Sequence, residues 1–389
     1  MRFKLRDLAA ATVCTLAAAG IAYTAAEIVA LRRFRERKAE PVRGTLPPVT
    51  ILKPLHGAEP ELYENLRSFC EQAYPQFQVI FGARDPADPA LEIARRLARE
   101  FPDADLRIVD GGSADRAANP KIANVSAMMA DAKYDLLAIV DSDIHVAPGY
   151  LATLASVFSD PAVGAATCLY AGIPLEGSAP AIGAAIVNER FMPSVLVAMM
   201  IEPLEYCFGS TMAVRRNVLE KIGGLAALGA GIGDDFTLGK LVSEAGYRVA
   251  LCPTVVQMTV SDSDLSELWV HQLRWQRTVL AARPRGFAGS LVTHVLPLAA
   301  LSAILCRSKT LGGLLFGAAF ALRVAVQSEA SKTLALKTRP SAWLIAAADA
   351  IAFGTWVAAF FSGDVTWRNR KFTIAPGGRL SDDTSSSWC

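Results

Sequence analysis

The sequence predicts an α/β domain with a mostly parallel sheet, attached to a membrane by apolar helices near both ends of the chain. Short apolar runs alternate with segments of helical periodicity between residues 48 and 260. Long apolar segments flank this region on both sides. Aspartates follow directly after several of the apolar runs, at the strand ends where open α/β sheets bind their ligands.

The composition is that of a mixed membrane and soluble protein. Of 389 residues, 52% are hydrophobic and 20% are charged, with a mean hydropathy of +0.31. A net charge of +2 gives no electrostatic case for a nucleic-acid partner. The 7 cysteines are scattered without a CxxC pattern, so we interpret them as reduced thiols and expect neither a zinc site nor a disulfide framework.

A membrane anchor is predicted at residues 8–31, because a span needs about 20 apolar residues. The basic run 32–38 follows it and is denser than the basic flank before it. Basic residues that flank a span stay on the cytoplasmic side. The N-terminus is therefore predicted outside, and the residues from 32 onward in the cytoplasm. A cleaved signal peptide is the alternative, although the apolar run is long for one.

Further membrane segments are predicted at 287–306, 311–328 and 341–361, the middle one being weak because it contains Arg323. Residues 181–201 are apolar but interrupted by charges, which makes them a poor span. A groove-lining helix at the membrane surface and an ordinary buried helix both fit that segment. The predicted organisation is therefore an anchor at 1–38, a globular domain at 48–285, membrane segments at 286–365 and a cytoplasmic tail at 366–389.

The globular domain alternates strands with helices, which favours a parallel sheet with helices on both faces. The predicted strands are 49–55, 78–83, 104–109 and 135–140. The predicted helices between them are 61–72, 90–101 and 123–132. Neither GxGxxG nor GxxxxGK[ST] occurs, so the sequence indicates neither a dinucleotide fold nor a P-loop.

The pair Asp141 and Asp143 ends the fourth predicted strand and offers oxygen ligands to a hard cation. Mg²⁺ or Mn²⁺ prefers one or two carboxylates together with phosphate oxygens of a substrate. Alternatively, the two aspartates cap the N-terminus of the helix that begins near Pro148 and bind no ligand. The spacing alone leaves both interpretations open.

A second acidic pair, Asp234 and Asp235, precedes a predicted helix in GIGDDFTLG. Acids in the first turn of a helix are favoured by its dipole, which is the structural explanation. The functional one is a general base directed at an acceptor hydroxyl. The segment 268–280 is rich in Trp and Arg, and it fits both an interfacial helix and a helix whose Arg274 and Trp275 face an active site.

Between residues 48 and 376 seven motifs follow one another: ILKPLHG, AYPQFQVIFGARDPADPA, NPKIANV, DSDIHV, GDDF, HQLRW and WRNRKF. In this order they resemble the ceramide glucosyltransferase family and its bacterial relatives, the hopanoid-associated glycosyltransferases. The resemblance implies a GT-A fold, which is Rossmann-like, and an inverting transfer of sugar from a UDP-sugar to a membrane lipid.

On the donor side, the resemblance implies that Asp85 contacts the uracil end of the UDP-sugar. Asp141 matches the second aspartate of the family pattern, and Asp143 completes a DxD that binds Mg²⁺ or Mn²⁺. Some relatives have glycine in place of Asp143, so Asp141 is the more essential of the two. Lys121 of NPK either neutralises phosphate or serves the structure.

On the acceptor side, the resemblance makes Asp235 the catalytic base, with Asp234 in place of the family's Glu. Arg274 and Trp275 match the RW of (Q/R)xxRW, near the diphosphate and the acceptor. The chain departs from this motif at its first position, where His271 stands instead of Gln or Arg. The role of His271 in substrate binding therefore stays open.

The predicted function is a hexosyltransferase of a bacterial inner membrane that uses a UDP-sugar, with UDP-glucose preferred, and a lipid acceptor such as ceramide. A hopanoid acceptor with UDP-N-acetylglucosamine is the alternative in the same class. A polysaccharide synthase is an alternative in another class, but the membrane part after residue 286 is short for a polymer channel. A non-catalytic lipid-binding relative has no use for a full set of clustered acids.

Overall fold

The computed structural model describes residues 6–37, 46–111, 119–229, 233–336 and 341–361, together with the backbone of residues 2–5 and of three short strands between 364 and 382. The chain forms two compact units. The helical unit comprises Met1–Arg37, Ala171–Pro203 and Val260–Arg370. The sheet unit comprises Lys38–Tyr170, Leu204–Thr259 and Lys371–Cys389.

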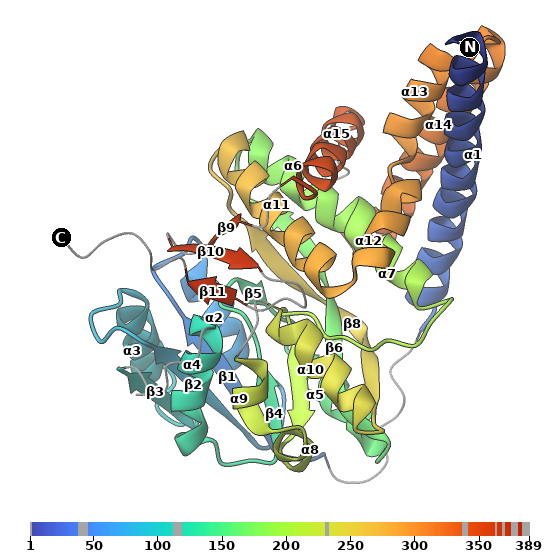
Figure 1. Ribbon diagram of the computed structural model, residues 1–389. Coiled ribbons are helices and arrows are strands. Elements are labelled where there is room, and N and C mark those ends of the chain that lie inside the picture. The colour runs from blue at the N-terminus through green and yellow to red at the C-terminus, as the bar shows by residue number, and fades with distance from the viewer. Residues whose placement is uncertain are drawn as a thin grey trace. The chain divides into compact units, whose positions relative to one another are not determined.

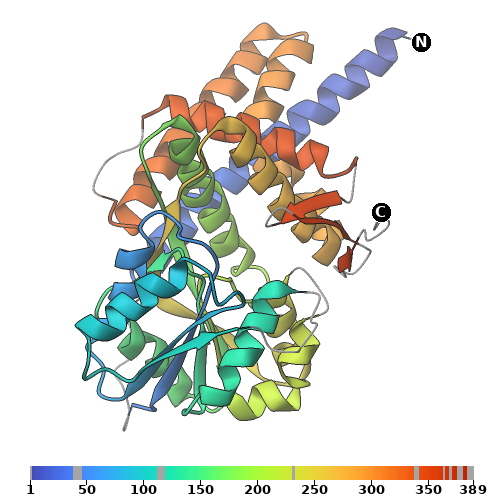
Figure 2. The same cartoon turned by 90° about the vertical axis from the view of Figure 1, so that its left-hand side faces the viewer.

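The sheet unit is built on an eight-stranded sheet in the order β3-β2-β1-β4-β7-β6-β8-β5 (Figures 1 and 2). Its first four strands are parallel: β1 (Val49–Leu55), β2 (Phe77–Ala83), β3 (Leu106–Asp110) and β4 (Leu136–Ile139). All four were predicted from the apolar runs, and every residue of β1 is buried. The parallel half thus confirms the α/β prediction.

The other half of the sheet is antiparallel, which the sequence did not predict. Its strands are β5 (Ile144–His145), β6 (Val163–Pro174), β7 (Met212–Arg215) and β8 (Arg248–Val260). β7 runs antiparallel to both β4 and β6, and β5 runs antiparallel to β8. Met212, the first residue of β7, pairs with Ile139 at the end of β4. This register brings the residues just before β7 beside Asp141.

The helices of the sheet unit confirm the predicted alternation. The three predicted between strands are α2 (Leu62–Cys70), α3 (Ala90–Glu100) and α4 (Pro120–Met128), and a 3₁₀ turn, η1 (Met129–Asp131), extends the last of them. The others are α5 (Tyr150–Ser156), α8 (Arg216–Lys221), α9 (Gly224–Leu228), α10 (Asp234–Glu244) and a 3₁₀ turn, η2 (Val157–Ser159). Near the C-terminus, β10 (Arg370–Ile374) pairs antiparallel with β11 (Leu380–Asp382).

The helical unit contains the apolar segments from both ends of the chain. Its long helices are α1 (Arg2–Arg35), α11 (Leu265–Ala282), α13 (Val295–Leu305), α14 (Lys309–Thr333) and α15 (Trp343–Ala358). Its shorter elements are α6 (Ser178–Ile186), the π-helix η3 (Val187–Phe191), α7 (Met192–Ala198), α12 (Pro284–Gly289), η4 (Ser290–Thr293) and β9 (Asp364–Trp367). α1, α13 and α14 share one apolar core (Figure 1).

Among the described residues, three helices are long and apolar enough to cross a membrane: Arg6–Arg35, Ser178–Ala198 and Lys309–Thr333. The first and third match predicted spans. The predicted span 287–306 corresponds to two helical segments, Pro284–Thr293 and Val295–Leu305, which pass the same test together but are bent by 62°. The helix Trp343–Ala358 falls short of the usual span length. Contrary to the prediction of a poor span at 181–201, the helix Ser178–Ala198 has sufficient length and hydropathy, and most of it is buried.

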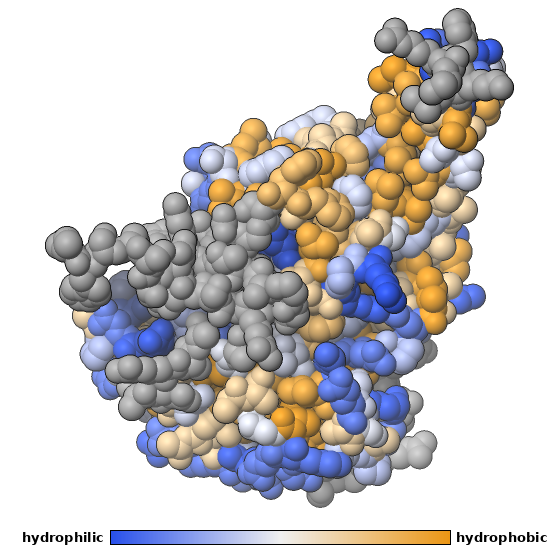
Figure 3. All heavy atoms as spheres, viewed as in Figure 1, coloured by the Kyte–Doolittle hydropathy of each residue, from blue (hydrophilic) through white to orange (hydrophobic). Residues whose placement is uncertain are grey.

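The surface of this bundle is apolar where α1, α13 and α14 face outward (Figure 3). Large hydrophobic side chains are exposed there, among them Leu8, Leu301, Ile304, Leu314 and Phe316. Soluble proteins rarely leave so many large apolar side chains exposed together. Between α13 and α14 the backbones approach closely, because a side-chain carbon on Gly312 would lie 2.6 Å from the Cα of Ala303. Small residues at helix contacts are typical of membrane proteins.

The charges that made 181–201 a poor span are paired inside the helical unit. Asn188 accepts from the backbone N–H of Gly172 at 2.7 Å and donates to its carbonyl at 2.9 Å. Gln327 donates to Glu189 at 3.0 Å, and Arg190 donates to Asp349 at 2.8 Å.

Arg323, which weakened the prediction of a span over α14, is also paired. It donates to Asp349 at 3.0 Å and to the carbonyl oxygen of Glu189, within the π-helix, at 2.7 Å. We call Glu189, Arg190, Arg323, Gln327 and Asp349 the buried helix network. The polar residues on α14 and in the segment 181–201 therefore pair with partners on separate helices, although one atom each of Glu189, Arg323 and Asp349 has no hydrogen-bond partner among the described residues.

Candidate active site

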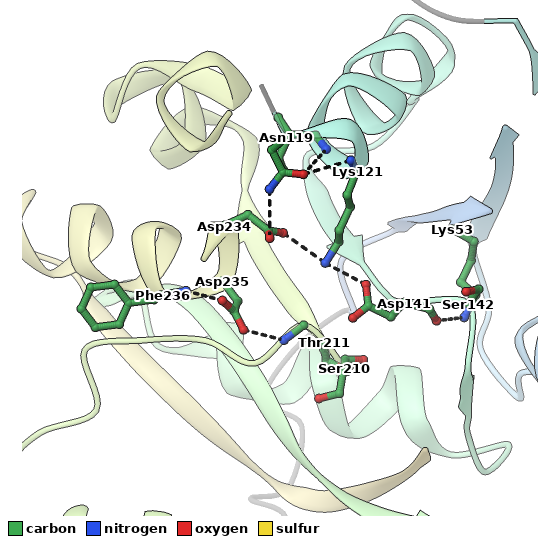
Figure 4. A network of polar contacts seen from close by, with 12 residues as sticks. Lys53, Asn119, Lys121, Asp141, Ser142, Ser210, Thr211, Asp234, Asp235 and Phe236 are labelled. Carbon is green, nitrogen blue, oxygen red and sulfur yellow. Dashed lines mark hydrogen bonds and ion pairs between the residues drawn. The ribbon is translucent and has the colours of Figure 1, made fainter. Parts of the chain in front are cut away.

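Lys121 stands at the centre of a charged cluster at one edge of the sheet (Figure 4). The sequence NPK places it there, because Asn119 caps α4 by accepting from the backbone N–H of Lys121 at 2.9 Å and Pro120 occupies the first turn. The buried ammonium of Lys121 lies 2.7 Å from Asp141 and 3.1 Å from Asp234. Burial opposes its charge, but these two carboxylates prevail and raise the pKa of Lys121.

Asp141 follows β4, and both its backbone N–H and its backbone carbonyl form hydrogen bonds. Its N–H donates to the carbonyl of Gly209 at 3.4 Å, and its own carbonyl accepts from Lys53 of β1. A side-chain carbon on Gly209 would lie 2.6 Å from one oxygen of the Asp141 carboxylate, so a larger residue would push this carboxylate out of its position. The Asp141 side chain is 39% exposed, which leaves it accessible to a ligand.

Asp143 lies deeper, and its Oδ1 atom is buried without a hydrogen-bond partner in the part of the chain that the structure describes. Burial raises the pKa of Asp143 to about 7, and the carboxylates of Asp141 and Glu59 add to the shift. Burial likewise lowers the pKa of Lys53 to about 7, against the pull of Asp143 and Asp141. Asp141 is thus ion-paired with Lys121, whereas Asp143 keeps one oxygen without a hydrogen-bond partner among the described residues.

Asp234 and Asp235 begin α10, as the sequence predicted. Asn119 donates to Asp234 at 3.3 Å. The two oxygens of Asp235 accept from the backbone N–H groups of Phe236 at 2.7 Å and Gly209 at 3.1 Å. Burial and the charge of Asp234, opposed by Lys121, together raise the pKa of Asp235 to about 6. A carboxylate held in this way is poised to accept a proton near neutral pH.

We call Asp141, Asp143, Asp234 and Asp235, with the two lysines Lys53 and Lys121, the acidic cluster. Carboxylate oxygens suit a hard divalent cation, and the buried, unpartnered Oδ1 of Asp143 beside the accessible Asp141 fits such an ion. Among the described residues, no group of three His, Cys, Asp or Glu side chains is placed to hold a metal alone. A cation at this pair therefore needs further oxygens from a ligand.

The remaining predicted site residues belong to other elements. Asp85 follows β2, is exposed, and accepts from the backbone N–H of Ala87 at 2.9 Å. His271, Arg274 and Trp275 lie on α11 of the helical unit. The ring centroids of His271 and Trp275 are 4.5 Å apart in an edge-to-face arrangement.

Sequence reasoning missed the side chains that support the acids. Lys53 interrupts an apolar strand, which was a usable signal, since a lysine in a fully buried strand needs a partner. Asn119 carries the ordinary signature of a helix cap and gives no hint of its second contact with Asp234. Gly209 gave no signal, because its importance depends on the antiparallel register of β7.

Comparison with known proteins matches this architecture to a family. The profile of "Glycosyl transferase family 21" matches residues 12–380, nearly the whole chain.

The chain belongs to glycosyl transferase family 21.

Curated ceramide glucosyltransferases share shorter stretches with this family 21 chain. It is 36% identical over 124 residues to one from Komagataella phaffii, an alignment that covers 31% of the chain and 24% of that protein. It is 25% identical over 263 residues to ceramide glucosyltransferase 3 of Caenorhabditis elegans, covering 66% of the chain and 56% of that protein. The chain thus spans about half or less of the length of these relatives.

Among solved structures, the chain resembles a mannosyltransferase from Pyrobaculum calidifontis determined with GDP-Man and Mn²⁺. The two share a TM-score of 0.50 and 20% identity, over 89% of this chain and 99% of that one. At this identity the likeness establishes the GT-A fold, as the resemblance implied. The family 21 assignment confirms the expected class of glycosyltransferase.

Proposed function

We propose that this family 21 chain is a membrane-bound inverting glycosyltransferase that transfers glucose from UDP-glucose to the hydroxyl of ceramide. The observation that carries the proposal is the half-buried Asp235 next to Asp234, which Lys121 joins to the partly exposed Asp141. One carboxylate accepts a proton while the other faces the leaving group. A single displacement needs this combination of one base and one stabilised leaving group.

Asp235 is the proposed base. Backbone N–H groups of Gly209 and Phe236 fix both of its oxygens, so the carboxylate does not have to reorganise when the acceptor arrives. Its pKa of about 6 leaves it ionised at neutral pH, yet basic enough to take the hydroxyl proton as the bond to the anomeric carbon forms. The attack comes from the face opposite the nucleotide, which inverts the configuration of the α-linked donor.

Asp141 and Asp143 are the proposed ligands of Mg²⁺ or Mn²⁺. When bound, the cation neutralises charge on the diphosphate of the departing UDP. Lys121 keeps Asp141 and Asp234 at fixed positions, since its ammonium bridges both carboxylates. Its bridging contacts support a positioning role, the second of the two roles that the sequence left open. Asp85, at the end of β2, is the proposed contact of the uracil.

The acceptor is proposed to come from the bilayer. Three helices of sufficient length and the exposed apolar side chains on α1, α13 and α14 support a multi-pass membrane protein. The basic run after residue 31 supports a cytoplasmic sheet unit in a bacterial inner membrane. His271, Arg274 and Trp275 of α11 are the proposed contacts of the diphosphate and the acceptor.

A panel of donors and acceptors tests the proposal. The purified protein in detergent receives UDP-glucose or UDP-N-acetylglucosamine, each with ceramide or a hopanoid polyol, and mass spectrometry identifies the lipid product. We expect glucosylceramide. If the product is an N-acetylglucosaminyl-hopanoid, the donor and the acceptor differ from those proposed, but the reaction is still a sugar transfer to a lipid. A growing polysaccharide, or no glycolipid with any donor, would refute the proposal.

A further inference from the structure

Asp262 and His271 form a hydrogen-bonded pair inside the helical unit. Asp262 lies two residues after β8 and is buried, and its Oδ1 is 3.1 Å from Nδ1 of His271. The His271 side chain is 33% exposed, so one end of the imidazole is anchored and the other is accessible. Nothing in the sequence alone marked Asp262 as a partner of this histidine.

The pairing fixes which nitrogen of His271 carries the proton. A carboxylate accepts hydrogen bonds and does not donate them, so Nδ1 must be the protonated nitrogen. In the neutral imidazole Nε2 is then an acceptor with a free lone pair. Across the described part of the chain, no side chain or backbone group donates to Nε2.

The surroundings hold this pair rigidly. The ring of Trp275, one helical turn later, packs edge-on against the imidazole at 4.5 Å. The backbone of α6 packs against the other end of the pair, because a side-chain carbon on Gly183 would lie 2.9 Å from Val260 and 3.4 Å from the free oxygen of Asp262. The imidazole therefore has little freedom to turn.

A purely structural role for Asp262 is poorly supported, because α11 is already capped by other residues. Asp264 accepts from the backbone N–H groups of Ser266 at 2.8 Å and Glu267 at 2.9 Å. Glu267 in return accepts from the backbone N–H of Ser263 at 2.7 Å, which completes a capping box. The start of the helix does not need Asp262, and burying a carboxylate beside a histidine is costly without a further use.

We propose that Asp262 is a positioning residue that locks His271 with Nε2 presented to a substrate hydroxyl. The inference rests on the proposed transfer reaction, which supplies two sources of such a hydroxyl, the lipid acceptor and the sugar of the donor. The family that the chain resembles has Gln or Arg where this chain has His271. Gln and Arg have no alternative tautomers, whereas an imidazole must be held in one tautomer to present a defined donor or acceptor.

A double-mutant cycle in the full chain tests this coupling. Asp262→Asn keeps the shape but lets the amide donate to Nδ1, which moves the proton to Nε2. We expect kcat/KM to fall about 10- to 100-fold, as when the partner that orients a metal-bound histidine is removed. When position 271 is already Gln, Asp262→Asn cannot change a histidine tautomer. We therefore expect Asp262→Asn to change kcat/KM by no more than about twofold in the His271→Gln variant. Equal losses in both backgrounds, or no loss in either, would overturn the inference.

Two further measurements separate the sources of the hydroxyl and guard against misfolding. A rise in KM for ceramide alone identifies the lipid hydroxyl, and a rise in KM for UDP-glucose alone identifies the sugar. Asp264→Asn is the matched control: it makes the same chemical change two residues away, and Asn caps helices as well as Asp does. We expect it to retain the parental kinetics and thermal stability.

The tautomer itself is measured by ¹⁵N NMR of the protein labelled at its 4 histidines, with His271→Gln assigning the signal. We expect the Nδ1–H form in the parent and the Nε2–H form in Asp262→Asn. This readout is independent of turnover. If the parent transfers no sugar, the proposed function fails and the NMR result still decides about the pair. An Nε2–H signal in the parent would overturn the inference.

Discussion

The acidic cluster of the sheet unit and the buried helix network of the helical unit both place carboxylates and cationic side chains away from water. The network contains two guanidiniums and two carboxylates, and both guanidiniums donate to the same oxygen of Asp349. In the acidic cluster, four aspartates face two lysines, and burial lowers the pKa of one of these, Lys53, to about 7. The network balances its charge, whereas the cluster keeps an excess of negative charge.

The two regions also differ in access. The side chains of Arg323 and Asp349 are 2% and 1% exposed, while that of Asp141 is 39% exposed. A balanced and closed group of charges fixes the packing of helices, since removing one partner leaves another charge buried alone. An unbalanced and open group is suited to a ligand that supplies the missing charge. Perturbed carboxylates in such a place are typical of catalytic sites.

The largest expected effect is on the acidic cluster. Asp235→Asn removes the proposed base and keeps its size, with one oxygen left to accept a backbone N–H, so we expect kcat to fall about 10²- to 10⁴-fold. Binding of UDP, measured by calorimetry, should be retained. Glu244→Gln, at the exposed end of the same helix, is the control and should behave as the parent. A loss of UDP binding in Asp235→Asn would assign this residue to the donor instead.

The next effect breaks the buried helix network. Asp349→Ala leaves Arg190 and Arg323 without their shared carboxylate, so we expect a loss of about 3–5 kcal/mol in the free energy of unfolding. Thermal unfolding in detergent measures it. Asp7→Ala removes an exposed ion pair of the same unit and should cost less than about 1 kcal/mol. Equal melting temperatures for the two variants would contradict a stabilising role for the network.

Metal removal is expected to act on the acidic cluster only. Chelation should abolish transfer, and Mg²⁺ or Mn²⁺ should restore it without changing the melting temperature of the helical unit. Asp143→Asn should raise the metal concentration for half-maximal activity about tenfold, the scale seen when a metal site loses a contact. Asp141→Asn should cost more, because it also breaks the ion pair with Lys121. Full activity in the presence of a chelator would show that transfer does not require a divalent cation.

The smallest effect concerns pH. Asp235 must be ionised to accept a proton, so kcat/KM should rise with pH and level off above its pKa of about 6. Asp234→Asn removes a neighbouring negative charge that raises this pKa, so the acidic limb of the profile should move to lower pH. A limb that stays in place, or moves upward, would mean that another group titrates there.

Much of this arrangement could be predicted from local sequence patterns. The four parallel strands, the helices between them and the cap of α4 follow from apolar periodicity and from residues such as Asn119 and Pro120. Asp141 and Asp235 were recognisable because each stands at the end or start of an element. The resemblance then assigned them to one site, and the bridge through Lys121 is consistent with that assignment.

The rest depends on pairings between distant parts of the chain. The antiparallel return of β7 places Gly209 against Asp141 and Asp235, and no local pattern encodes that register. The pairing of Arg323 with Asp349 likewise turned an apparent flaw in a span into a contact between two helices. A charge in an apolar segment indicates that a partner exists but does not say which one.

The stereochemistry of the product tests the central claim most directly, namely that the acidic cluster catalyses a single displacement with Asp235 as its base. The anomeric proton coupling of the glycolipid formed from α-linked UDP-glucose reports it by NMR. The account predicts a β-glycoside from the parent protein. An α-glycoside would mean retention of configuration, and it would contradict the assignment of Asp235 as the base of a direct attack.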